Sequence, residues 1–294
     1  MPTVRALERL VVALDFSTHG SRVLERVALL PLSRRAIVTL LHVRPPLPPL
    51  LRHDGLARAA LHELQRAADT LRPRLGAAAT VATVVARGAP ARALARRARA
   101  LDAELVVLGR RGGGGLRRLA LGSTAAGVAA ADVAPVLVVG PTPAAVYRRP
   151  LAAVDFSAVT DAVLHAVSRV TGGAARITLL HAVSPYWQDV LVAAGTPRRS
   201  IDRYRRDALE TARRELARVG LRAERLGVQV QRLCEEGDPR AAIPAVAARQ
   251  GADLVALGTR GHGRAARRLL GSVAAAVADA APCDVLVVPP RRPA

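Results

Sequence analysis

Two glycine-rich stretches dominate the organisation of this chain of 294 residues: Gly109-Arg-Arg-Gly-Gly-Gly-Gly-Leu-Arg-Arg-Leu-Ala-Leu-Gly-Ser123 and Gly258-Thr-Arg-Gly-His-Gly-Arg-Ala-Ala-Arg-Arg-Leu-Leu-Gly-Ser272. Both contain a glycine, two residues, a second glycine, nine residues and then Gly-Ser. Each follows a short apolar run and precedes an alanine-rich stretch. Glycine lets backbone amides approach a ligand closely, and free amides at a helix start attract anions. We therefore predict two strand–loop–helix units with anion sites, in which Ser123 or Ser272 caps the helix.

The repetition extends well beyond these glycines. Val-Ala-Leu-Asp-Phe-Ser at 12–17 returns as Ala-Ala-Val-Asp-Phe-Ser at 152–157, and the other apolar runs return in the same order. Matching residues lie about 140 positions apart early in the chain and 149 apart later, so the second copy has about ten extra residues between its second and third strands. We expect a first domain at 1–141, a proline-rich linker at 142–149 and a second domain at 150–290.

Each copy alternates short apolar runs with longer stretches of helical spacing. Apolar runs bounded by helices are typical of a parallel sheet buried on both faces, and right-handed crossovers make such a sheet doubly wound. The predicted fold class is therefore α/β, with two Rossmann-like, five-stranded domains in tandem. Strands are expected at 10–14, 37–43, 80–86, 104–108 and 135–139, then at 150–154, 176–183, 228–234, 253–257 and 284–288, and first-copy helices at 20–31, 55–72, 90–101 and 123–132.

Polar and glycine residues recur at the ends of these strands. Ligands of doubly wound sheets bind beyond the carboxyl ends of the strands, where the strand order reverses. The recurring residues are Asp15 and Asp155 after the first strand, His42 and His181 at the end of the second, and Gly109 and Gly258 after the fourth. The sequence therefore predicts one binding site at this edge of each copy.

Composition excludes several classes of protein. The 44 basic residues are all arginine, and with 23 acidic residues the net charge is +21. Without lysine there is no Walker A motif, no Schiff-base catalyst and no protein-kinase lysine. Aromatic residues make up 2% of the chain, too few for a stacking platform, so nucleic acid is not an expected partner. No membrane span and no secretory signal are found, which favours a cytoplasmic location.

Metal and catalytic constellations are not predicted. The seven histidines and two cysteines have no metal-ligand spacing, and no nucleophile elbow or repeated carboxylate pair lies beside the glycine stretches. Gly261-His-Gly-Arg-Ala-Ala266 matches a dinucleotide-binding string, but it follows a fourth strand and lacks the acidic residue expected further on. We therefore assign neither catalytic residues nor metal ligands.

The doubled glycine motif, together with the aspartate after each first strand, resembles the universal stress protein family in its tandem, two-domain form. This resemblance covers essentially the whole chain. It implies that each domain has the flavodoxin-like strand order 3-2-1-4-5. It also implies a site for ATP or a related adenine nucleotide, with or without Mg²⁺.

The same resemblance implies the residues of each site. Asp15 and Asp155 would contact the nucleoside end of the ligand, and Val43, or the smaller Ala182 in the second copy, would lie beside the base. The residues around ribose and phosphates would be Gly109, Gly112, Gly122, Ser123 and Thr124 in the first copy, and Gly258, Gly261, Gly271, Ser272 and Val273 in the second.

Some of these residues have a second interpretation. Asp15 and Asp155 could instead balance the dipole of the helix that follows. His42 and His181 are interpreted as strand-end residues with a backbone partner rather than as acid–base catalysts. The arginines near the glycines could neutralise phosphates or lie on a solvated helix face; they are Arg110, Arg111, Arg117 and Arg118, then Arg260, Arg264, Arg267 and Arg268.

Assembly and thiols follow from the implied strand order. The fifth strands, 135–139 and 284–288, would be apolar edges, so we expect the two domains to pair within one chain as a pseudo-dimer. A homodimer of whole chains stays open. Cys234 and Cys283 would lie at opposite edges of the second sheet, too far apart for a disulfide.

The functional interpretation is a nucleotide-binding sensor or regulator of the stress response. Catalysis would be incidental, although slow ATP hydrolysis or autophosphorylation on a loop Ser or Thr stays open. The alternative is an interaction scaffold that binds no nucleotide and docks acidic partners or nucleic acid through its arginines.

Overall fold

The computed structural model of the chain describes residues 4–17, 20–44, 46, 54–76, 79–110, 121–141, 144–173, 175–184, 186–225, 227–259 and 270–290. The first copy contributes β1 (Leu7–Ala13), β2 (Leu32–Arg44), β3 (Thr80–Arg87), β4 (Leu105–Gly109) and β5 (Val136–Val139). The second contributes β6 (Pro150–Ala153), β7 (Ile177–Val183), β8 (Val230–Glu236), β9 (Leu254–Gly258) and β10 (Asp284–Val288).

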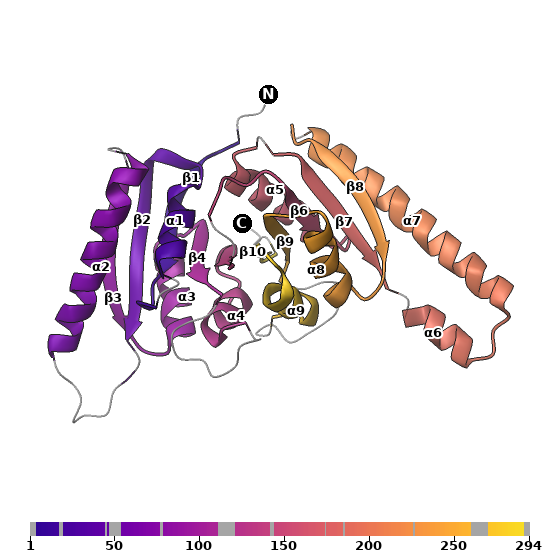
Figure 1. Cartoon of the computed structure of the whole chain (residues 1–294), viewed down its shortest axis with the longest axis horizontal. Coiled ribbons are helices and arrows are strands. Elements are labelled where there is room, and N and C mark those ends of the chain that lie inside the picture. The colour runs from indigo at the N-terminus through magenta and orange to yellow at the C-terminus, as the bar shows by residue number, and fades with distance from the viewer. Residues whose placement is uncertain are drawn as a thin grey trace.

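These strands form one continuous sheet across both copies (Figure 1). The order is β3-β2-β1-β4-β5-β10-β9-β6-β7-β8, so each half has the order 3-2-1-4-5. All pairs are parallel except the central one, in which β5 and β10 are antiparallel and Leu137 lies opposite Leu286. The predicted tandem α/β fold and the pairing of the two domains through their fifth strands are confirmed.

Helices cover both faces of the sheet. The described helices of the first copy are α1 (Gly20–Ala28), α2 (Asp54–Leu75), α3 (Pro90–Ala100) and α4 (Ser123–Ala130). Those of the second copy are α5 (Thr160–Thr171), α6 (Tyr186–Ala193), α7 (Arg198–Arg225), α8 (Pro239–Arg249) and α9 (Ser272–Ala280). Among them, none is long and apolar enough to span a membrane.

Two apolar cores lie between these helices and the sheet. One core joins α1, α2, α5 and α7 to residues such as Leu10 and Leu254, and the other joins α3, α4, α8 and α9 to residues such as Val106 and Val255. Successive strand residues point to opposite faces, so a continuous aliphatic run serves both cores at once. Both cores cross the boundary between the copies, which makes the two domains one packed unit.

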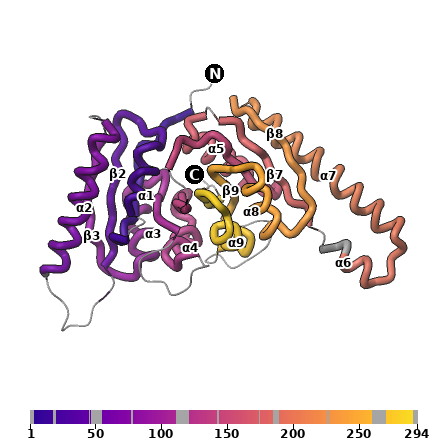
Figure 2. Tube along the Cα trace, in the orientation of Figure 1, coloured from indigo at the N-terminus to yellow at the C-terminus, as the bar shows by residue number. Residues whose placement is uncertain are grey.

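The extra residues of the second copy lie between β7 and β8, as predicted. They include α6 and the start of α7, which project away from the sheet as a tapering arm (Figure 2). Residues 202–207 of α7 are all exposed, whereas Leu216 and Val219 pack on the sheet. The second half of the long helix is therefore the part that packs on the sheet, while Arg205 in its first half pairs with Glu236 at the end of β8.

The two thiols are free and far apart, as predicted. Cys234 lies on β8 and Cys283 directly precedes β10, and these are the outer strands of the second half of the sheet. Burial raises the pKa of the Cys283 thiol to about 12. It also raises the pKa of Cys234, which is less buried.

Candidate functional site

The turn after the first strand has the same geometry in both copies. In the second copy the Asp155 carboxylate accepts a hydrogen bond from the Ser157 amide at 3.1 Å, and Phe156 adopts a φ of 61°. The Phe156 ring stacks on His181 with 4.2 Å between ring centroids. A positive φ is costly for a bulky residue, so the carboxylate bond and the stacking hold a strained turn at the strand end.

The histidine of this turn is fixed by the backbone. The Nδ1 atom of His181 lies 2.8 Å from the carbonyl oxygen of Val154, and an acceptor there requires Nδ1 to donate. In the first copy His42 makes the same bond to Leu14 at 2.8 Å. The interpretation of both histidines as strand-end residues with a backbone partner is confirmed.

The first copy repeats the rest of the turn closely. Asp15 accepts from the Ser17 amide at 3.1 Å, Phe16 has a φ of 60°, and its ring lies 4.2 Å from that of His42. In both copies the aspartate accepts its hydrogen bond from an amide of the turn. The helix begins only later, at Gly20 for α1 and at Thr160 for α5. This bond positions the carboxylate at the carboxyl edge of the sheet.

Glycine, not serine, caps the helix that follows the fourth strand. Gly271 is the N-cap of α9 with φ −59° and ψ 148°, its amide donates to the carbonyl oxygen of Thr259 at 2.9 Å, and no side chain caps the helix. Gly122 is the N-cap of α4 with φ −57° and ψ 140°. The prediction that Ser123 or Ser272 caps the helix is wrong, because each serine is already the first helical residue. The backbone amides of the first helical turn therefore have no side-chain cap as hydrogen-bond acceptor.

Residues of the second copy converge on a cavity of about 330 Å³. Its wall includes the ends of β6, β7 and β9 and the starts of α5, α8 and α9. Six residues predicted for this site line it, namely Asp155, Ala182, Gly258, Gly271, Ser272 and Val273. The seventh, Gly261, lies outside the described residues.

The matching residues of the first copy occupy equivalent places. β1 lies between β2 and β4, so Asp15, Val43 and Gly109 follow or end three neighbouring strands. Gly122 is pinned to the end of β4 by its amide, which donates to the carbonyl oxygen of Arg110 at 3.0 Å. Ser123 and Thr124 begin α4, and Gly112 lies outside the described residues.

Comparison with known proteins agrees with this geometry. A family model described as the universal stress protein family matches residues 6–140 and, a second time, residues 147–289. The chain belongs to the universal stress protein family. Its two matches correspond to the two halves of the sheet, so the chain is a tandem member of that family.

Relatives of known sequence match shorter segments of this universal stress protein. A Staphylococcus haemolyticus protein named as a universal stress protein is 46% identical over 68 residues, which are 22% of this chain and 41% of the relative. A Staphylococcus epidermidis protein with the same kind of name is 51% identical over 55 residues, 18% of this chain and 33% of the relative. The chain thus matches less than half the length of these relatives.

Solved structures match over nearly the whole universal stress protein chain. A universal stress protein from Archaeoglobus fulgidus has a TM-score of 0.67 and 19% identity, with 96% of each chain covered. One from Pseudomonas aeruginosa has a TM-score of 0.63 and 20% identity, with 97% of this chain and 94% of that chain covered. At such identities the likeness establishes the fold.

One residue of the second site was missed by sequence reasoning. Thr160 lines the cavity, is 1% exposed, and its Oγ1 atom has no hydrogen-bond partner among the described residues. An unpaired buried hydroxyl costs free energy unless a ligand or water completes it. Comparison of the two copies does not reveal this residue, because its counterpart in the first copy is Gly20.

Arg110 does not lie on a solvated face. Its guanidinium reaches into the opposite domain and donates to the carbonyl oxygens of Ala281 at 2.7 Å and Cys283 at 2.6 Å. These carbonyls lie just beyond the C-terminal end of α9, where a cation is favourable. The other arginines considered for phosphates, Arg111, Arg117, Arg118, Arg260, Arg264, Arg267 and Arg268, lie outside the described residues.

Metal ligands do not gather in the described part of the universal stress protein. No group of three or more His, Cys, Asp or Glu side chains there is arranged to hold a metal ion.

Proposed function

We propose that this tandem universal stress protein binds ATP or a related adenine nucleotide in each domain and acts as a regulator of the stress response. The proposal gives the protein a cytoplasmic location and assigns it no dedicated catalytic residue. It includes Mg²⁺ as a companion of the nucleotide phosphates. The domain limits of the two sites are those expected from the repeat, 1–141 and 150–290.

The observation that carries this proposal is the convergence of separate strand ends on one cavity. Asp155 is more than a hundred residues away from Gly258 and Gly271 along the chain, yet all three line the same space. Its volume of about 330 Å³ is within the range of small-molecule sites. The cavity also lies at the carboxyl edge of the sheet, where doubly wound folds bind ligands.

The chemistry of the wall suits a nucleotide from one end to the other. The start of α9 at Gly271 and Ser272 offers backbone amides and the positive end of the helix dipole to phosphates. The carboxylate of Asp155 is a natural acceptor for ribose hydroxyls, and the hydroxyl of Thr160 gains a partner when a polar ligand binds. Apolar residues such as Ile243 and Val163 complete the wall and suit a base.

The proposal makes the nucleotide a signal rather than a substrate. Binding would change the surface that a partner meets. Arg110 directly follows Gly109 of the first site, and its guanidinium donates to carbonyl oxygens just beyond the end of α9. Since the start of α9 belongs to the second site, this helix connects the two sites. Hydrolysis or autophosphorylation is not needed for such a signal.

Site counting tests the proposal. Equilibrium dialysis with labelled ATP and Mg²⁺ should give two sites in the parent chain, one in Gly122→Asp, one in Gly271→Asp and none in the double variant. Both glycines have φ angles near −60° that any residue adopts, so the substitution introduces no backbone strain. The added carboxylate acts instead through its volume and its repulsion of phosphate.

Gly55→Asp is the matched control. Gly55 lies in the first turn of α2, and a Cβ atom there would meet nothing within 4 Å, so this variant adds the same charge at an exposed position outside the residues proposed for either site. It should keep two sites. If the parent bound no adenine nucleotide, the interaction-scaffold interpretation would replace this one. Binding that survived in the double variant would move the site away from the helix starts.

A further inference from the structure

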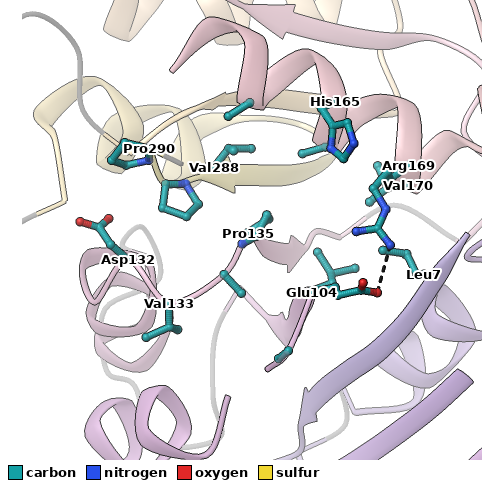
Figure 3. Close-up of a pocket in the computed structure, with 16 residues that line it drawn as sticks. Leu7, Glu104, Asp132, Val133, Pro135, His165, Arg169, Val170, Val288 and Pro290 are labelled. Atoms are coloured by element: carbon teal, nitrogen blue, oxygen red, sulfur yellow. Dashed lines mark hydrogen bonds and ion pairs between the residues drawn. The ribbon is translucent and has the colours of Figure 1, made fainter. Parts of the chain in front are cut away.

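A second cavity, of about 270 Å³, lies between the two domains. Its lining comes from α5 of the second copy, from the chain around the starts of β4 and β5 in the first copy, and from the end of β10 (Figure 3). It shares no lining residue with the cavity that contains Asp155. It is therefore a separate space that the proposed function leaves unexplained.

The repeat shows what the equivalent space on the other side of the interface contains. Leu7 corresponds to Tyr147 and Ala166 to Arg26, both 140 residues apart, and Pro135 corresponds to Asp284, 149 residues away. The strand registers support these matches, since Leu10 lies opposite Leu105 in one copy and their counterparts, Pro150 and Leu254, lie opposite each other in the second.

The side of the interface that contains Arg26, Tyr147 and Asp284 is called the filled side here, because large polar side chains contact one another at these three positions. The Arg26 guanidinium lies 2.6 Å from the Asp284 carboxylate and 4.1 Å from the centre of the Tyr147 ring. The Tyr147 hydroxyl donates to Asp284 at 2.7 Å, and so does the Gly140 amide at 2.7 Å. Arg26, Tyr147 and Asp284 are 2%, 4% and 0% exposed, so the space between the domains is closed.

On the open side, which contains the cavity, the same positions hold apolar residues, and Leu7 and Ala166 are smaller than their counterparts. Leu7, Pro135 and Ala166 all line the cavity, and they leave unfilled the volume that a phenol ring and a guanidinium take up opposite. Val170 and Val288, which are 3% and 2% exposed, continue this apolar lining. The cavity therefore reflects the different residues that the two copies have at these three positions.

Two charged residues that line this cavity, Arg169 and Glu104, are already matched to each other, and a third, Asp132, accepts a hydrogen bond from Thr259 Oγ1 at 3.3 Å. Arg169 lies 3.0 Å from Glu104 and also donates to the carbonyl oxygens of Arg5 and Ala6 at 3.0 Å each (Figure 3). Glu104 accepts from the Glu8 amide at 2.7 Å, and these bonds hold its pKa below the ordinary value despite its burial. An anionic ligand would have to compete with Glu104 for Arg169, the arginine of the lining, and would lose its water without a free countercharge.

We propose that the interdomain cavity binds a small, uncharged molecule built around one or two rings, of about the size of indole. An apolar cavity of about 150 Å³ is enough for a benzene ring, so about 270 Å³ accommodates a bicyclic one. The filled side shows that an aromatic ring packs in the equivalent space, because the Tyr147 ring does so there. Burial of apolar ligand surface supplies the affinity.

Binding of indole itself tests this site. Isothermal titration of the parent chain, with ATP and Mg²⁺ present, should show saturable binding at one site per chain. Ala166→Leu extends an apolar side chain into the cavity, along the path that Arg26 takes on the filled side, and should weaken indole binding at least about tenfold. Ala59→Leu, an exposed alanine on α2, is the matched control and should bind like the parent.

Location is tested separately with 5-bromoindole in crystals of the full chain. An anomalous bromine peak between α5 and Pro135 is expected. A peak only beside Asp155, or unchanged titration in Ala166→Leu, would overturn the proposal, and so would no saturable binding in the parent. None of these outcomes depends on the nucleotide count in Gly122→Asp and Gly271→Asp, so the two proposals fail independently.

Discussion

Arg110 and Thr259 occupy the same place in the two copies, one residue beyond the glycine that ends the fourth strand, yet they contact the opposite copy differently. Arg110 donates to two carbonyl oxygens beyond the end of α9, whereas Thr259 Oγ1 donates to the Asp132 carboxylate at 3.3 Å. The Asp-Phe-Ser turns and the glycines, by contrast, recur unchanged. The Asp-Phe-Ser turns and the motif glycines, which face each copy's own site, are thus kept, whereas the residues at this crossing position differ.

Because of this difference, the interface distinguishes a first copy from a second copy. If both copies were identical at the interface, β5 could pair equally well with β5 of a second chain. The ion pair between Arg26 and Asp284 forms only when the first copy meets the second. Such one-sided contacts favour pairing of a first copy with a second copy over pairing of two like copies, in the way that buried polar groups specify register elsewhere.

The largest effect is expected where the filled side is broken. Asp284→Ala leaves the Arg26 guanidinium buried without its carboxylate and removes the acceptor of Tyr147 and Gly140. Loss of one partner from a buried pair costs about 3–5 kcal/mol of unfolding free energy. The counterpart variant, Pro135→Ala, touches the open side and should cost much less. Urea unfolding of both variants measures the contrast.

Tyr147→Phe keeps this test informative if Asp284→Ala does not fold. Burial and the neighbouring Asp284 raise the pKa of the Tyr147 hydroxyl, so it stays a donor across the ordinary pH range. Its removal deletes one bond to a buried carboxylate and should cost about 1–3 kcal/mol. Costs as small as those of surface changes in both variants would mean that the filled side is not what joins the domains.

A middle-sized effect is expected at the crossing contacts. Arg110→Ala removes charged hydrogen bonds to Ala281 and Cys283 and should lower the unfolding free energy by about 2 kcal/mol. Thr259→Val removes one longer hydrogen bond and should cost about 1 kcal/mol or less. Hydrogen exchange should show faster opening of the last turn of α9 in Arg110→Ala. Equal losses in the two variants would remove the asymmetry inferred for these positions.

The pH dependence of stability should reveal a further difference between the copies. It arises at Cys283, whose counterpart in the first copy is Ala134. The folded-state pKa of about 12 exceeds the reference value of 9.0, so its contribution is complete below pH 9 and is lost as pH rises toward 12. Between pH 8 and pH 10 the parent should lose about 1.4 kcal/mol more stability than Cys283→Ala, which makes the two copies alike here. Urea unfolding at both pH values measures it, and parallel pH profiles would contradict the assignment.

The repeat explains how much could be predicted from the sequence. The strands were predictable because every signal occurred twice. The strand order and the edge pairing were implied by the family resemblance that the doubled motif carries. The same motif pointed to Asp155, Gly258 and Gly271, which meet in one cavity. The capping serines were misassigned because Gly-Ser leaves the helix start ambiguous by one residue.

What the sequence could not reveal depends on how the copies dock. Nothing in the local sequence marks Arg26 as buried, because it lies on a helix with other charged residues and its counterpart is Ala166. Its partners come from the linker and from β10, more than a hundred residues later. Likewise, the interdomain cavity is defined by differences between the copies, whereas sequence reasoning sought what they share.

The smallest and sharpest effect is expected at Thr160, where the first copy has Gly20. Thr160→Val keeps the shape of the side chain and removes only the hydroxyl, whose Oγ1 is buried without a partner in the described structure. Removing an unpaired polar group should leave the unfolding free energy unchanged or slightly higher. The ATP affinity of the second site should fall about fivefold, the equivalent of one hydrogen bond of about 1 kcal/mol, while the first site stays as it is. Dialysis in the Gly122→Asp background isolates the second site for this measurement. A loss of stability would show that the hydroxyl is already satisfied in the free protein, and an unchanged affinity would place the nucleotide away from the start of α5.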